Sequence, residues 1–143
     1  MAEPPRKIKT KHGELTLEEI AGLLPGTGEV MRSVGDCFSM SWHAAHGGNW
    51  ELAMYYLRRV RSLLRGLALT RPKYAEQIRE LDARYLEATY QALIGRDLWT
   101  FDARYEEATD QANVYHVDTG HPYIRWVRPE EPPDRALDLQ LGS

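Results

Sequence analysis

Four long stretches of helical pattern, separated by short turn signals, constrain the fold of this chain most. Between about residues 27 and 46, apolar residues such as Met31, Val34 and Phe38 recur at three- and four-residue spacing, which builds one apolar face on a helix. Comparable patterns cover about residues 50–69, 72–94 and 98–119. Gly47-Gly48, Pro72 and Gly95 mark the breaks between them. Because such short connections force successive helices to be antiparallel neighbours, the pattern predicts an all-α, up-down-up-down antiparallel four-helix bundle within residues 15–120.

The two ends of the chain follow different patterns. Residues 1–14 are polar and charged, and we expect a flexible N-terminal arm there. Thr16 is a suitable N-cap for a short helix over residues 16–20. Residues 121–143 are rich in proline, which excludes a helix. Because Tyr123, Ile124 and Trp126 are costly to leave in water, we expect this extended tail to pack on the bundle.

Composition and charge exclude several classes of function. A formal net charge of −3 offers no concentrated basic surface for nucleic acid. No apolar stretch reaches the roughly 20 residues that a membrane span needs, and the N-terminus lacks the apolar core of a signal peptide. These observations predict a cytoplasmic protein that binds neither nucleic acid nor membrane. The single cysteine, Cys37, lies on the apolar face of its helix, where a buried, inert thiol is expected.

Two histidines, His43 and His46, lie three residues apart on the first long helix and could share a metal ion. They fall beside the apolar stripe, so the competing interpretation is a polar flank or a subunit contact. A di-iron bundle would need Glu-x-x-His repeats, which the sequence lacks. On the second long helix, Arg58, Arg61 and Arg65 share one side, most simply a solvated face.

The end of the last long helix carries a different pattern. In Ala112-Asn113-Val114-Tyr115-His116, the chain resembles cytochrome c′ and related class II cytochromes. Those proteins are four-helix bundles that attach haem near the end of the last helix through Cys-x-x-Cys-His. By this resemblance, Ala112 and Tyr115 stand at the cysteine positions and His116 at the axial-ligand position. Without those thiols no thioether can form, so the resemblance implies a related topology without covalent haem.

A non-covalent haem remains open at the same place. The layout of cytochrome b562 is similar, with a histidine on the last helix and a methionine on the first, and His116 with Met31 would meet that arrangement. The competing interpretation is that Met31 fills the core and that His116 interacts with the helix C-terminus. The cofactor is therefore undetermined.

A pocket for a small molecule is expected near His116. Ala108 and Ala112 are small inward residues on the last helix, and small residues leave space unless neighbours fill it. Asn113 and His116 would supply polar anchors at one end of this space. The expected walls are aromatic: Phe38, Tyr56, Tyr85, Tyr105 and Tyr115. The competing interpretation is a solid core in which these rings occupy the room that the alanines leave.

Three functions are compatible with these patterns. The first is a small-molecule-binding bundle with its pocket near His116. The second is a non-redox enzyme, a lyase or isomerase that uses His116 as acid or base, although no catalytic motif is present. The third is a dimeric structural or protein-interaction module, with His43, His46 and the arginines at its interface. A homodimer through the first two long helices is expected.

Overall fold

A computed structural model describes residues 3–142 of the chain, so the expectations for Met1, Ala2 and Ser143 lie outside the described residues. The fold is all-α with one small hairpin. The helices are α1 (Leu17–Gly22), α2 (Thr27–Gly47), α3 (Trp50–Thr70), α4 (Ala75–Glu80), α5 (Glu87–Ile94) and α6 (Leu98–Asp118). A 3₁₀ turn, η1 (Pro72–Tyr74), precedes α4, and a π-helical segment, η2 (Leu81–Leu86), joins α4 to α5.

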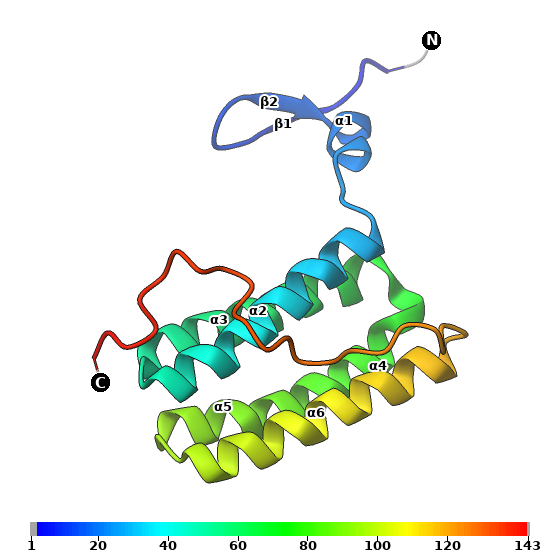
Figure 1. Cartoon of the computed structure of the whole chain (residues 1–143). Helices are drawn as coiled ribbons and strands as arrows, with labels where there is room; N and C mark the ends of the chain where they lie inside the picture. Colours follow the sequence, from blue (N-terminus) through cyan, green and yellow to red (C-terminus); the bar gives the residue numbers. More distant parts are fainter. Residues whose placement is uncertain (1–2, 143) are drawn as a thin grey trace.

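The helical body, residues 27–118, is arranged in two neighbouring pairs of helices (Figure 1). The chain turns from α2 into α3 at Gly48, which has the left-handed φ of 90° that glycine tolerates best. Asn49 then caps α3 by accepting a hydrogen bond from the backbone N–H of Leu52. Asp97 caps α6 in the same way, through the N–H of Thr100. These turns hold α3 beside α2 and α6 beside α5 (Figure 1).

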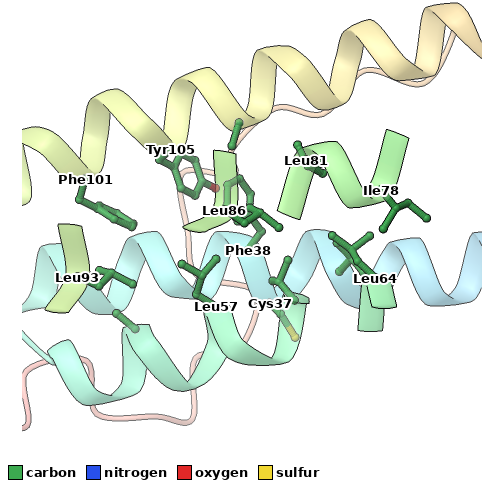
Figure 2. Packing of buried hydrophobic residues seen from close by; sticks show 14 of the residues in the cluster. Cys37, Phe38, Leu57, Leu64, Ile78, Leu81, Leu86, Leu93, Phe101 and Tyr105 are labelled. Atoms are coloured by element: carbon green, nitrogen blue, oxygen red, sulfur yellow. The ribbon is translucent and has the colours of Figure 1, made fainter. Parts of the chain in front are cut away.

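The core lies between these two pairs of helices (Figure 2). Phe38 of α2 and Tyr105 of α6 stack with ring centroids 4.1 Å apart and planes 8° from parallel. Leu57 and Phe101 are fully buried nearby. Burial of each such side chain contributes about 1.5–3 kcal/mol to folding, so this central layer holds the pairs together.

The third helical segment, which runs from η1 through α4 and η2 to α5 (residues 72–94), departs from a regular α-helix at η2. There the backbone N–H of Glu87 donates to the carbonyl of Asp82, five residues earlier. The wide turn brings Leu81 and Leu86 to the core, and both are buried. The sequence pattern placed Tyr85 on the inner face after Leu81. Tyr85 is instead half-buried, and its hydroxyl donates to Gln111. The extra residue in the turn explains this difference.

The N-terminal segment contains a hairpin that the sequence analysis did not predict. In residues 1–14, which were expected to form a flexible arm, β1 (Lys7–Lys9) is ordered and pairs antiparallel with β2 (Glu14–Thr16), which follows at the end of that arm. Each strand offers a single apolar residue, which is too weak an alternation to predict a strand. The predicted capping role of Thr16 is confirmed, because Thr16 and Glu19 form a reciprocal capping box at α1. The hairpin and α1 stand clear of the helical body, and none of residues 3–24 is buried (Figure 1).

The tail contains neither helix nor strand over residues 121–142 and runs back along the helical body (Figure 1). Asn113 of α6 holds the tail through two hydrogen bonds. Its side-chain amide donates to the Trp126 carbonyl at 3.1 Å and accepts from the Trp126 N–H at 2.7 Å. Further along, Asn49 donates to the carbonyl of Asp138. A side chain at Gly47 would collide with the backbone of Leu139, so glycine permits this close approach.

Burial in the tail is uneven. Trp126 is half-buried, whereas Tyr123 is 78% exposed and Ile124 is 41% exposed. The expectation that Tyr123 packs against the helices is therefore wrong. Burying Trp126 covers the largest apolar group of this segment and leaves Tyr123 on the outer side.

Among the described residues, no helix is both long enough and apolar enough to cross a membrane.

Candidate ligand-binding site

A cavity of about 360 Å³ lies at the end of the helical body where α2 begins and α6 ends. Leu64 of α3, Ile78 of α4 and the two leucines of η2 supply much of its apolar wall (Figure 2). Ala108 and Ala112 of α6 leave the space that larger side chains would fill. Ile124 and Trp126 of the tail close one side of the cavity. The volume falls within the roughly 300–1,000 Å³ of ordinary small-molecule sites.

Three polar atoms at this cavity are shielded from water and have no hydrogen-bond partner. They are Oε1 of Gln77, the hydroxyl of Tyr115 and Nδ1 of His116, and all three residues line the cavity. An unpaired buried polar group costs about 1–3 kcal/mol. Three of them around one cavity indicate a site that is completed by a bound hydrogen-bonding group.

The electrostatics of the site favour neutral side chains. Burial lowers the pKa of His116, although the backbone of Ile124 partly offsets this effect, so the imidazole is neutral at pH 7. Burial, together with the nearby Glu80 carboxylate, which lies outside hydrogen-bonding geometry, raises the pKa of Tyr115 to about 12. No aspartate, glutamate, lysine or arginine lines the cavity. The cavity therefore carries hydrogen-bonding groups without a formal charge.

The structure gathers six of the ten residues expected at the pocket. Those that line the cavity are Met31, Phe38, Ala108, Ala112, Tyr115 and His116. His116 also meets the Trp126 ring edge-to-face, with centroids 5.7 Å apart. The imidazole thus lies at the cavity, covered by the tail.

The other four expected residues have different surroundings. Asn113 holds the tail, as described above. Tyr105 stacks on Phe38 and is 5% exposed, and its burial raises its pKa to about 12. Tyr85 bonds Gln111, and Tyr56 is half-buried on α3 beside Tyr55. None of these four lines the cavity.

Several lining residues were not anticipated. Gln77 and Tyr74 come from the third helical segment, and Thr119 and His121 follow the end of α6. His121 is half-buried at the cavity. Gln77 lies three residues after Tyr74 and four before Leu81, and this helical spacing was the signal available from the sequence. For the loop residues, only the return of the chain after Gly120 brings them to the cavity.

His43 and His46 do not form a metal site. His43 is buried beneath the tail, with Nε2 3.0 Å from the Pro129 carbonyl, and His46 pairs with Asp102 at 2.6 Å. Trp42 stacks on His46, meets the His43 ring edge-to-face and is covered by Arg128 of the tail. No group of three or more potential metal ligands of the histidine, cysteine, aspartate or glutamate type occurs within residues 3–142. Cys37 is buried as predicted, and burial raises the pKa of its thiol.

The arginine side of α3 is solvated only in part: Arg58 and Arg65 are exposed as expected, whereas Arg61 is half-buried. Arg61 donates to Asp82 of η2 and to Glu87 of α5, each at 2.6 Å. Arg58 donates to the Tyr90 hydroxyl at 3.0 Å. Because their partners lie on the third helical segment, these arginines join helices within the chain.

Comparison with known proteins gave no match. No protein-family model matches the chain, and neither a curated protein nor a solved structure is similar enough to count as a relative.

Proposed function

We propose that the chain is a four-helix bundle of up-down-up-down topology that binds a small molecule in the cavity beside His116. Its four members would be α2, α3, the segment from α4 to α5, and α6. The short turns after α2 and before α6 support this topology. As the resemblance to cytochrome c′ implies, the bundle would share that topology without a covalent haem.

The cavity with its unpartnered polar atoms is the single observation that carries this proposal. A well-packed interior has few voids larger than a water molecule, and its buried polar groups are paired. At this cavity, a void larger than a water molecule coincides with three unpaired buried polar atoms. An apolar wall with a few convergent polar groups is the usual composition of a ligand site.

Binding can be tested with N-phenyl-1-naphthylamine, a neutral apolar dye whose fluorescence rises on leaving water. We expect saturable binding to the purified chain. Ala112→Leu fills the cavity and should weaken dye binding at least about tenfold, since the added side chain and the dye compete for one volume. Ala88→Leu makes the same change at a half-buried helical position outside the cavity and should leave binding unchanged. Equal binding by both variants would place the dye elsewhere and contradict the proposal.

A non-covalent haem is the second candidate, because Met31 and His116 line the same cavity. These side chains would hold the iron from α2 and α6. The lining contains no lysine or arginine to pair with the carboxylates of haem, which makes the fit incomplete. Titration with haemin checks this candidate. A Soret band that disappears in both Met31→Leu and His116→Ala would establish it, whereas a band that survives His116→Ala would remove His116 as the ligand.

The remaining two hypotheses have less support. His116 has an unpartnered nitrogen and shares the cavity lining with His121 and Tyr115, but among the described residues no hydrogen bond joins these groups into a pair for proton transfer, and His121 instead contacts the Thr119 hydroxyl. The homodimer hypothesis placed His43 and the arginines of α3, including Arg61, at the interface between the two copies. His43 instead bonds the chain's own tail, and Arg61 bonds its neighbouring helical segment.

A further inference from the structure

The polar groups of the cavity differ in what they can offer to a ligand. Gln77 Oε1 can only accept a hydrogen bond, while the Tyr115 hydroxyl can donate or accept. Nδ1 of a neutral imidazole does either, depending on the tautomer. A ligand that satisfies this set must itself both donate and accept hydrogen bonds.

No permanently charged side chain lines this cavity, whose titratable lining groups are His116, His121, Tyr74 and Tyr115. Its lining has no lysine or arginine to neutralise an anion and no carboxylate to neutralise a cation. Moving an unpaired charge into such surroundings costs far more than moving a neutral polar group. The Glu80 carboxylate does not line the cavity, but it lies near enough to the Tyr115 hydroxyl to raise its pKa, and it therefore adds to the penalty for an anionic ligand.

From these two observations, we propose that the ligand is an uncharged amphiphile: an apolar body that fills the space beside Ala108 and Ala112, with an alcohol or primary amide group hydrogen-bonded to Tyr115, His116 and Gln77. This inference rests on the proposed function and adds the chemical class of the ligand. Tyr115 is then a specificity-determining residue, because its hydroxyl recognises the head group while its ring remains part of the wall.

A series of eight-carbon probes with different head groups tests the ligand class. Isothermal titration with 1-octanol, octanamide, octanoate and octylammonium at pH 7.5 holds the apolar body constant. We expect the alcohol and the amide to bind at least about tenfold more tightly than either ion, a difference of about 1.4 kcal/mol.

Matched variants assign the preference to Tyr115. Tyr115→Phe keeps the ring and removes the hydroxyl, so it should weaken octanamide binding about three- to tenfold. Binding of toluene, which has no head group, should not change. Tyr56→Phe removes a tyrosine hydroxyl outside the cavity and should leave both affinities unaltered.

The outcomes separate the two proposals. If none of these probes nor the dye binds, the proposed function itself fails. If the probes bind but an ion binds as tightly as the alcohol and amide, the cavity is a ligand site and the inferred class is wrong. If Tyr115→Phe leaves octanamide binding unchanged, the hydroxyl has no part in recognition.

Discussion

At the scale of single residues, Asn113 links the helical body to the tail. Its side-chain amide makes both possible hydrogen bonds to the backbone of Trp126, in the manner of a strand neighbour. Trp126 in turn contacts Phe38 and His116, with ring centroids 6.3 and 5.7 Å away. One amide therefore determines the position of an aromatic wall of the cavity.

Replacement of Asn113 by alanine should destabilise the fold by about 1–3 kcal/mol, because both half-buried hydrogen bonds to Trp126 are lost. Urea denaturation measures this change. Asn113→Asp keeps the bond from the Trp126 N–H but cannot donate to the Trp126 carbonyl, so it should fall between alanine and the natural residue. Equal stability of all three proteins would mean that the tail is not held at this point.

The buried His43 and the half-buried His116 predict a pH dependence of stability. Burial is the largest cause that lowers the pKa of both His43 and His116 below the ordinary value of 6.5. The unfolded chain then binds protons that the folded chain does not. Stability is thus fully present above pH 6.5 and is lost as the pH falls below it.

Urea midpoints at pH 8 and pH 5 check this sign. The midpoint should be lower at pH 5, and His43→Gln, which can still donate to the Pro129 carbonyl, should reduce the difference. His12 is exposed, so His12→Gln is the control and should not change it. A higher midpoint at pH 5 would contradict the assignment of buried neutral imidazoles.

At the scale of elements, η2 determines which face of the third helical segment meets the core. The wide turn keeps Leu81 and Leu86 inward although five residues separate them. It also keeps Asp82 and Glu87 on the side that faces Arg61. A regular helix would bring residues four apart, not five, to the same face.

Deletion of Ala83, an exposed residue within η2, should therefore convert the segment to a regular α-helix. Both pairs then stand four residues apart and remain on their faces, so the free energy of unfolding should change by no more than about 1 kcal/mol. Deletion of the exposed Glu106 from the regular helix α6 is the matched control. It rotates half of the α6 core face by about 100°, and cooperative unfolding should be lost.

If the two deletions lower the free energy of unfolding equally, η2 does not contain an extra residue that the fold can lose. Circular dichroism and urea denaturation together distinguish the cases, since the first reports helix content and the second cooperativity.

At the scale of the whole molecule, the chain divides at residues 25–27. The helical body begins where Arg71, at the end of α3, donates to the Thr27 hydroxyl at 2.6 Å and to the Pro25 carbonyl at 2.8 Å. These bonds fix the start of α2, which lies at the cavity. The hairpin and α1 precede this point and contribute no buried residue.

Removal of residues 1–24 should therefore leave the helical body intact. We expect the free energy of unfolding to change by less than about 0.5 kcal/mol, because residues 3–24 contain only exposed and half-buried groups. Thermal and urea unfolding of the shortened chain measure this. Truncation at the other end, after Gly120, is the contrasting control, since it removes Trp126 and the partners of Asn113, His43 and Asn49. A large loss of stability on N-terminal truncation would show that the segment packs on the helices.

What the sequence determined by itself is the set of helices and their ends. Apolar spacing, Asn49, Asp97 and the Gly47-Gly48 turn act between residues close in the chain, so α2, α3 and α6 begin and end within about one residue of their predicted limits. The same helical spacing predicted that Met31, Ala112 and His116 lie toward one end of the helical body. Only the tertiary structure decided the rest. The π turn left Tyr85 half-buried against the core, with its hydroxyl bonded to Gln111. The backbone of the returning tail forms hydrogen bonds with Asn113 and His43, and Gln77 reaches the cavity from α4. These outcomes depend on contacts between segments up to 86 residues apart, and a pattern of neighbouring residues cannot predict such contacts.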